Sequence, residues 1–179
     1  MVMRKTLSYL GIACLVFFYC ASLQAQPGGD KKNGDQLFLQ QAYKNASWLL
    51  KLGKLAHQLA ASQSVRDHGR LVTEAYEKHL DEIRNLAAKK GVALLDDTDP
   101  ARFNTIQYFS RRTGAELDRN YISLMIDENN DQMSLYRKEA QQGRDREISD
   151  FASRSIQRLE GDAAVAKMIL VNLPKPVLK

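Results

Sequence analysis

Apolar residues recur along most of the chain at alternating steps of four and three, the spacing that places them on one face of an α-helix. This pattern predicts four long helices, at about 35–61, 64–90, 113–142 and 145–171. Residues that favour helices, such as Ala, Leu, Gln, Glu, Lys and Arg, dominate these stretches. Strand signals are sparse by comparison, so the sequence predicts an all-α protein.

Residues at the expected helix ends support these limits. Gly91 follows two lysines, and a glycine after basic residues is typical of a helix C-terminus. Asp145 can cap the last helix by accepting hydrogen bonds from its first backbone N–H groups. Thr113 with Glu116, and Ser64 with the aspartate that follows it by three, have the spacing of capping boxes.

The connector between the second and third long helices, residues 92–112, contains a shorter helix. Asp99 precedes Pro100, and an N-cap aspartate followed by proline at the first helical position is a common helix start. The sequence therefore predicts a short helix from Pro100 to about Arg111.

Each long helix has one apolar face, and four such faces are most economically buried against one another. We therefore expect an all-α four-helix bundle, ferritin-like, with a short extra helix in the connector between helices two and three. The 21-residue connector at 92–112 is long enough to return along the bundle, as a ferritin-like crossover requires. A simple up-and-down order remains open.

The first 25 residues have the layout of a secretory signal peptide. Arg4 and Lys5 form a short positive segment, residues 7–23 carry no charge, and small residues lead to a cleavage site after Ala25. An uncleaved membrane anchor is the alternative, since 17 uncharged residues lie at the lower limit for a spanning helix. We expect a periplasmic or secreted protein. Its expected parts are a signal peptide (1–25), a flexible linker (26–34), the bundle (35–171) and a C-terminal tail (172–179).

Composition and charge narrow the possible chemistry. Both cysteines, Cys14 and Cys20, fall in the leader, so a mature chain has neither disulfides nor thiolate chemistry. Cleavage removes two of the 26 basic residues and no acid, which leaves 24 against 21 and a net charge of +3. These charges are interspersed, and no basic block supports nucleic-acid binding. No second hydrophobic span follows the leader, so no transmembrane segment is expected in the mature chain.

The three histidines, His57, His68 and His79, limit the metal chemistry. Residues eleven apart on one helix lie about 16 Å apart along its axis, which is too far to share a metal ion. Di-iron bundles use a Glu-x-x-His motif, and no histidine here has an acid three residues before it. His79 lies on the apolar face of its helix, where a hydrogen-bonded core histidine is the simpler interpretation.

The third long helix carries the polar run DENND, residues 127–131, near its middle. One possible inner face contains Glu128 and Asp131, and a face rotated by one residue contains Asn129. Either brings a polar group inward, and buried polar groups must pair. We expect a structural polar layer in the core, formed by Asn45, His79, Asn129 and Asp162. The alternatives are a solvated face, or a metal site formed by His79, Glu128, Asp131 and Asp162.

Three segments together resemble one family of exported bacterial proteins: LGKLA at 52–56, TGAELDRNYISLMI at 113–126 and GRDREISDFA at 143–152. This is domain of unknown function family 4142, often labelled predicted outer-membrane protein. The resemblance implies a secreted, ferritin-like helical bundle. It also implies an acid on helix one, an Asp-His pair on helix two and a histidine on each of helices three and four. Those positions fall near Leu49, Ala75, Tyr76, Asn129 and Asp162, so this chain resembles a divergent member that lacks the histidines.

No nucleophile–base pair, phosphate loop or zinc-ligand spacing occurs, so no catalytic or cofactor-binding residue is predicted. We expect a non-enzymatic bundle of the cell envelope that binds a partner protein or a small ligand without a cofactor. The alternative is a ferritin-like metal-binding or redox protein with a carboxylate-rich core, in which a metal ion is the cofactor.

Overall fold

The computed structural model describes residues 29–175, with side chains from residue 34 onward. This part of the chain contains five α-helices and no strand: α1 (Gly29–Leu59), α2 (Gln63–Lys90), α3 (Pro100–Ser110), α4 (Gly114–Gln142) and α5 (Arg146–Asn172). The all-α prediction is confirmed. The predicted signal peptide at 1–25, with Cys14 and Cys20, lies outside the described residues. Helix α1 begins inside the stretch 26–34 that was expected to be a linker.

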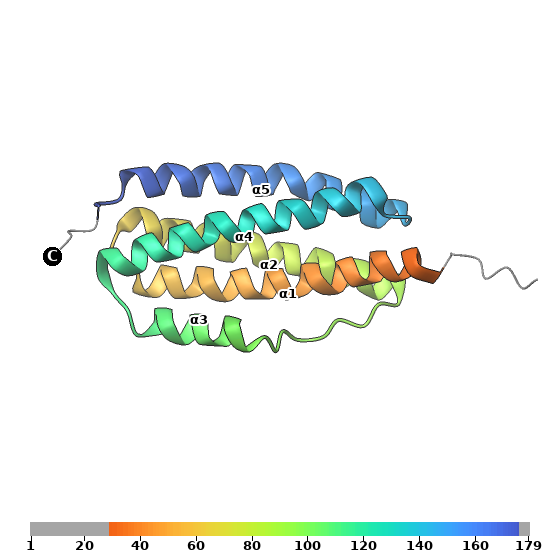
Figure 1. Ribbon diagram of the computed structural model, residues 1–179, viewed down its shortest axis with the longest axis horizontal. Coiled ribbons are helices and arrows are strands. Elements are labelled where there is room, and N and C mark those ends of the chain that lie inside the picture. The colour runs from red at the N-terminus through yellow and green to blue at the C-terminus, as the bar shows by residue number, and fades with distance from the viewer. Residues whose placement is uncertain (1–28, 176–179) are drawn as a thin grey trace, which may run out of the picture.

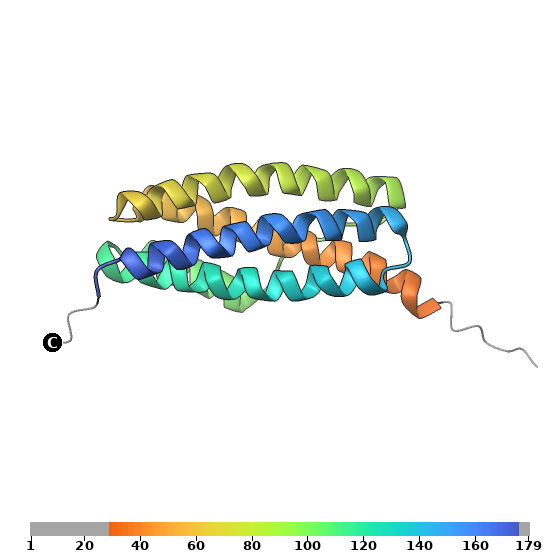
Figure 2. The same ribbon diagram turned by 90° about the horizontal axis from the view of Figure 1, so that it is seen from above.

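The four long helices lie side by side as two antiparallel hairpins (Figure 1, Figure 2). In the first hairpin α1 packs along α2, and in the second α4 packs along α5. The hairpins meet along two lines, α1 against α4 and α2 against α5, with far less contact than within each hairpin. Two closely packed helix pairs therefore form one bundle through looser interfaces.

The connector and α3 run along the outer side of α1 (Figure 1). Gln40 Nε2 donates a hydrogen bond to the Ala93 carbonyl (3.1 Å), and Arg102 Nη2 donates to Asn45 Oδ1 (2.7 Å). The chain thereby returns to the end of the bundle where α2 began before α4 starts. Helices α2 and α4 consequently run in the same direction.

Several helix ends form as the sequence predicts. Asp99 accepts a hydrogen bond from the Ala101 N–H and begins α3, and Asp145 caps α5. Gly91 ends α2 in the left-handed conformation, with φ of 66°, which glycine adopts without steric cost. Neither predicted capping box forms: α2 begins after Ser62, and neither Ser62 nor Thr113 makes a side-chain cap.

The turn between α1 and α2 is held from the neighbouring hairpin instead. The Asp118 carboxylate on α4 accepts hydrogen bonds from the N–H groups of Ala61 (2.9 Å) and Ser62 (2.7 Å). Asp118 is buried, so its charge is compensated by these two donors. This contact fixes the start of α4 against the end of the first hairpin.

Two glycines let α1 and α2 approach closely. A Cβ atom added at Gly69 would lie 2.6 Å from the His57 nitrogen and 2.7 Å from the Gly53 carbonyl oxygen. A Cβ at Gly53 would lie 2.8 Å from a Val72 methyl carbon. Because the first two contacts are with backbone, only glycine fits at position 69 without moving the helices apart.

The apolar core follows the bundle axis, and its largest fully buried apolar side chains include Leu39, Leu49, Leu52, Leu80, Ile83, Leu117, Ile122 and Met125. Within residues 29–175, none of the helices combines the length and hydrophobicity that crossing a membrane requires. Polar side chains interrupt this core near its middle, between the two hairpins.

Candidate functional site

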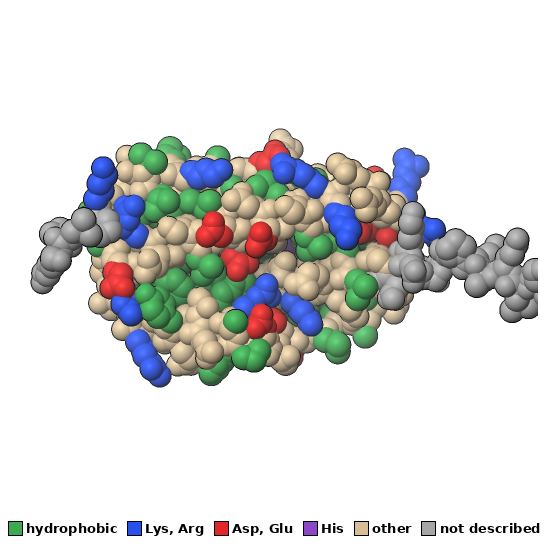
Figure 3. Space-filling view, viewed as in Figure 1, with side chains coloured by type: hydrophobic (Ala, Val, Ile, Leu, Met, Phe, Trp, Pro, Cys, Tyr) green, Lys and Arg blue, Asp and Glu red, His purple; other side chains and the backbone are tan. Residues whose placement is uncertain are grey.

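Near its middle, helix α4 turns the amides of Asn129 and Gln132 inward and the carboxylates of Asp127 and Asp131 outward. Its buried residues include Ile122, Met125, Asn129, Gln132 and Tyr136. Asp127 and Asp131 are exposed. On the face seen in Figure 3, acidic side chains gather near the middle, where α4 lies in Figure 1. Of the two inner faces that the sequence left open, the structure has the one that contains Asn129.

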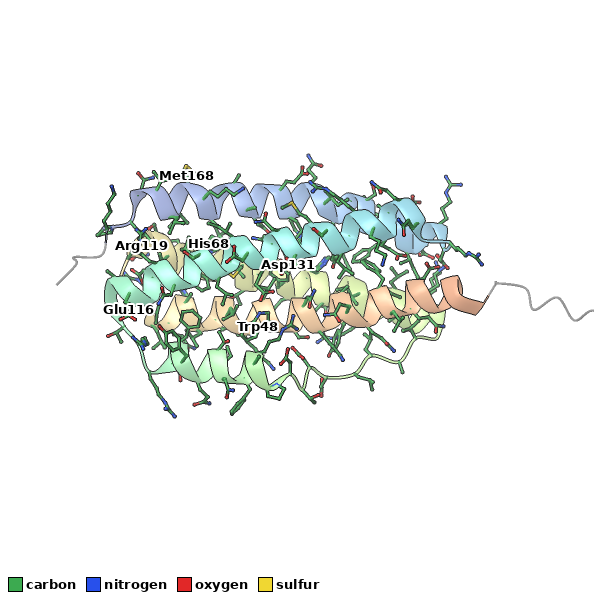
Figure 4. All side chains as sticks on the ribbon, viewed as in Figure 1. Trp48, His68, Glu116, Arg119, Asp131 and Met168 are labelled. Carbon is green, nitrogen blue, oxygen red and sulfur yellow. The ribbon has the colours of Figure 1, made fainter. Side chains whose placement is uncertain are left out.

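Glu128 lies at the border of the core and faces α1. Its Oε1 accepts a hydrogen bond from Trp48 Nε1 (2.9 Å), and Figure 4 marks Trp48 on α1 and Asp131 on α4. Burial raises the pKa of Glu128, while the Trp48 hydrogen bond and the charge of Arg102 oppose the rise. Glu128 is therefore tied to the α1 side of the bundle.

A set of polar side chains, which we call the polar layer, joins α2, α4 and α5 in the interior. It consists of Tyr76, Asn129, Gln132, Arg158 and Asp162. Gln132 Nε2 donates a hydrogen bond to the Tyr76 hydroxyl (3.0 Å), and Arg158 Nη1 donates to Asp162 Oδ2 (3.0 Å). The Arg158 guanidinium carbon lies 4.9 Å from the centre of the Tyr76 ring, a cation–π distance.

Electrostatics couple Arg158 to its neighbours in the polar layer. Burial raises the pKa of Asp162, and the charge and hydrogen bond of Arg158 oppose that rise. Burial also raises the pKa of the Tyr76 phenol, so Tyr76 stays protonated. The guanidinium thus acts on both the Asp162 carboxyl and the Tyr76 phenol.

Part of the polar layer has no hydrogen-bond partner among the described residues. The unpaired atoms are Asn129 Nδ2 and Oδ1, Gln132 Oε1 and Arg158 Nη2. Asn129 and Gln132 are both 0 % exposed. Leaving a buried polar group unpaired costs about 1–3 kcal/mol, and such groups in a native protein call for an explanation. The layer therefore contains buried donors and acceptors that the described residues leave unpaired.

Two buried histidines of α2 pair with tyrosines of α4. His68 Nδ1 lies 3.1 Å from the Tyr121 hydroxyl, and His79 Nε2 lies 2.7 Å from the Tyr136 hydroxyl. Burial lowers the pKa of His68 to about 4 and that of His79 to about 3, and the charge of Arg158 adds to the second effect. Both rings are neutral at neutral pH, and both link the two hairpins.

Asn45 lies apart from the polar layer. It is buried against the connector, where its Oδ1 accepts hydrogen bonds from Gln41 (2.8 Å) and Arg102 (2.7 Å). Arg102 also pairs with Asp97 (2.7 Å). Of the four residues expected to form one layer, Asn129 and Asp162 belong to it, His79 lies beside it, and Asn45 anchors α3.

The four candidate metal ligands lie apart in the structure. His79 contacts Tyr136, and Glu128 contacts Trp48. Asp162 contacts Arg158, and Asp131 is exposed. Among the residues with described side chains, no three His, Cys, Asp or Glu are grouped closely enough to hold a metal ion. Of the positions marked by the family resemblance, Tyr76, Asn129 and Asp162 lie in the polar layer, and Leu49 lies in the apolar core.

A groove between α2 and α5 lies beside the polar layer. This α2–α5 groove has a volume of about 440 Å³, and its lining includes Lys78, His79, Glu82, Phe151, Arg154 and Arg158. A second hollow of about 470 Å³ shares Glu82, Phe151 and Arg154 with it and extends toward Lys89. Arg158 belongs both to the lining of this groove and to the polar layer, whereas Tyr76, Asn129 and Gln132 do not line the groove.

A separate cluster of acids holds the start of α1 at the loop between α4 and α5. Asp35 accepts hydrogen bonds from the N–H groups of Arg144 (3.1 Å) and Asp145 (2.8 Å). Burial, and next the negative charge of Asp35, raise the pKa of Glu139 to about 7. Glu139 Oε1 is buried and has no partner among the described residues. Lys90 balances the cluster by pairing with Asp145 (2.7 Å).

The sequence reasoning missed Gln132 and Arg158 as interior polar residues. Gln132 follows Asn129 by three residues, so the choice of the Asn129 face would have placed it inside as well. Arg158 precedes Asp162 by four, an ion-pair spacing that marks one helix face. Its long side chain starts at the border of the bundle and carries the guanidinium inward.

The fold and the site define a class: an all-helical bundle of two hairpins with a polar interior. The sequence matches Domain of unknown function (DUF4142) over residues 20–169, and the chain belongs to this family. The family predicted from the three sequence segments is thus confirmed. The comparison with curated proteins gave no match.

Two crystal structures share this fold. One is a DUF305 fragment from Deinococcus radiodurans, with 13% identity and a TM-score of 0.70 over 78% of this chain and 97% of that chain. The other is a conserved hypothetical protein from Mycobacterium tuberculosis, with 13% identity and a TM-score of 0.65 over 83% of this chain and 99% of that chain. At this identity the likeness concerns the fold alone.

Proposed function

We propose that the protein is an exported, ferritin-like four-helix bundle that acts as a non-enzymatic binding module of the cell envelope. Its ligand binds between the two hairpins, at the polar layer. The leader at residues 1–25 supports export to the periplasm. The order of the helices, with a long connector between two hairpins, supports the ferritin-like description.

The observation that carries the proposal is the set of unpaired polar atoms in the core. Asn129 alone contributes one donor and one acceptor without a partner among the described residues. An apolar residue of similar size at this position would avoid the cost of burying them. A site kept at the expense of stability is typical of a functional site.

Binding is better supported than catalysis by the residues around the layer. The two buried histidines are neutral and each is held by a tyrosine hydroxyl, and Asp162 is held by Arg158. A metal-binding or redox role has weaker support, because His79, Glu128 and Asp162 each have a different partner. The layer itself offers amide, hydroxyl and guanidinium groups, which suit a polar organic ligand better than a cation.

The proposal is tested by purifying the protein from the periplasm of an expressing strain and measuring its intact mass under denaturing and native conditions, together with its metal content. We expect a polypeptide that begins at Gln26, and a small molecule retained only under native conditions. An Asn129→Leu variant of the same purified protein should keep the fold but lose this molecule.

The matched control is Asn130→Leu, an exposed position next in the chain, which should retain the molecule. Stoichiometric iron, manganese or zinc would contradict the proposal and favour the metal-binding alternative. Retention of the molecule by the Asn129→Leu variant would place the binding site elsewhere.

A further inference from the structure

We infer that the α2–α5 groove binds an anionic group, a phosphate or a carboxylate, carried on an apolar body. This inference rests on the proposed function and names the chemical class of its ligand.

Positive charge dominates the lining of the groove. Lys78, Arg154 and Arg158 line it, whereas Glu82 is its one acid. Lys78 and Arg154 form no ion pair with any residue whose side chain is described, while nine basic residues elsewhere, such as Lys54, Arg70 and Arg137, do pair with acids. Three cations against one acid in the lining favour an anion.

The position of the Arg158 guanidinium is fixed by its neighbours. Asp162 holds its Nη1, and the Tyr76 ring packs against the guanidinium, so the side chain is fixed in position. Its Nη2 is buried and has no hydrogen-bond partner among the described residues. A guanidinium offers parallel N–H donors that match the oxygen atoms of phosphate and carboxylate, and Arg is favoured where such groups are recognised.

The neighbouring residues define the rest of the ligand. Phe151 lines both the groove and the adjoining hollow, so an apolar body can lie along it from one hollow to the other. His79 stacks on Phe151, with ring centres 5.2 Å apart and an angle of 17°. Both rings line the groove, although only 4 % of His79 and 3 % of Phe151 is exposed, so they offer an apolar group a small aromatic contact.

The test uses the full mature chain and three probes in isothermal titration: inorganic phosphate, phenyl phosphate and benzyl alcohol. The variant pair Lys78→Gln/Arg154→Gln removes the two unpaired cations, and both side chains are exposed, so the fold is retained. The control pair Arg146→Gln/Lys167→Gln removes the same charge from exposed positions on α5. Trp48, the single tryptophan, lies on the α1 side of the bundle and reports by fluorescence any binding there.

We expect phenyl phosphate to bind more tightly than inorganic phosphate, and benzyl alcohol to bind more weakly than both. The Lys78/Arg154 variant should lose at least about tenfold in phenyl phosphate affinity, since hydrogen bonds to charged groups contribute about 1.5–3 kcal/mol each. The control pair should change affinity less than twofold. Trp48 emission should not change.

Equal losses in the two variant pairs would overturn the inference, because they would indicate general attraction to net charge. Benzyl alcohol binding as tightly as phenyl phosphate would overturn the anionic class. No anion binding, together with a molecule retained at Asn129, would overturn this inference and leave the proposed function standing. No retained molecule and no binding of any probe would overturn both.

The same variants distinguish a lipid headgroup from a free metabolite as the source of the anionic group. Vesicles of phosphatidylglycerol would retain the wild-type chain more strongly than the Lys78/Arg154 variant if the group is a lipid headgroup. Phenyl phosphate binding without vesicle retention would assign it to a free metabolite. Either result supports the groove as an anion site.

Discussion

Helix α2 belongs to two interfaces that are built in opposite ways. Toward α1 it presents Gly69 and Val72, and the two backbones approach so closely that an added Cβ at Gly69 would lie 2.6 Å from a backbone nitrogen. Toward α4 and α5 it presents His68, Tyr76 and His79, which make hydrogen bonds or line a groove of about 440 Å³. Helix α2 thus packs tightly against α1 on one side and makes polar contacts with α4 and α5 on the other.

The difference indicates how stability and binding are divided in this fold. The close α1–α2 contact buries apolar surface and leaves no space, so it fixes the first hairpin as a unit. The looser interface between hairpins contains the unpaired amides and the fixed guanidinium, where space and polar groups allow a ligand. Each prediction below acts on one of these interfaces.

Gly69→Leu should have the largest effect on stability. Its side chain would meet the Gly53 carbonyl oxygen and the His57 nitrogen, which are backbone atoms and cannot move aside. We expect a loss of about 3 kcal/mol in the free energy of unfolding, at the upper end for overpacking. Denaturation in urea measures it. Gly161→Leu on the exposed face of α5, where no atom lies within 4 Å, is the matched control and should not destabilise the protein.

Acid should weaken the interface between the hairpins. The folded-state pKa values of His68 and His79, about 4 and about 3, lie below the ordinary histidine value of 6.5. As pH falls below 6.5, the unfolded chain takes up protons that the folded chain does not, so stability is lost down to the folded-state pKa values. The steepest loss is about 1.4 kcal/mol per pH unit for each histidine.

Unfolding curves between pH 7 and pH 4 measure this dependence. His79→Gln keeps a hydrogen-bonding group opposite Tyr136 and should reduce the slope, while His57→Gln at an exposed position should leave it unchanged. Equal slopes for wild type and His79→Gln would show that this histidine is not buried in a neutral form.

Glu139→Gln should stabilise the protein at neutral and higher pH. Burial raises the pKa of Glu139 in the folded state to about 7, above the ordinary glutamate value of 4.5. Its contribution to the free energy of unfolding is therefore fully present below pH 4.5 and is lost as pH rises through 7. The gain from the substitution should therefore be near zero at pH 4 and grow to about 1–2 kcal/mol at pH 8. Glu74→Gln, an exposed pair with Arg70, is the control and should show no such trend. A gain that is the same at pH 4 and pH 8 would contradict the shifted pKa.

The helices could be predicted because their determinants are local. The four-and-three spacing, Asp99 with Pro100, Asp145 and Gly91 act within one or two turns of chain, and the structure has all of them at the expected ends. The capping boxes did not form: α2 begins one residue before Ser64, and neither Ser62 nor Thr113 makes a side-chain cap. At the turn before α2, Asp118 from α4 accepts hydrogen bonds from the N–H groups of Ala61 and Ser62.

The polar layer could be predicted only in part, because it depends on helix rotation and on long side chains. A shift of one residue turns a helix by about 100°, and the sequence of α4 fits two inner faces. Because both faces were possible, the sequence did not predict that Gln132 is buried. Arg158 starts from a border position, and only the packed neighbours show that its guanidinium lies over Tyr76. Asn45 has the right spacing for the core, but the connector covers it.

The free energy of unfolding of Asn129→Leu, compared with wild type by urea denaturation in ligand-free buffer, tests most directly whether the polar interface is kept for binding rather than for stability. Leucine fills a similar volume and removes two buried atoms without partners among the described residues. We predict that the variant is about 1–2 kcal/mol more stable than wild type. A variant less stable by 1 kcal/mol or more would show that Asn129 makes stabilising hydrogen bonds, and the polar layer would then be structural.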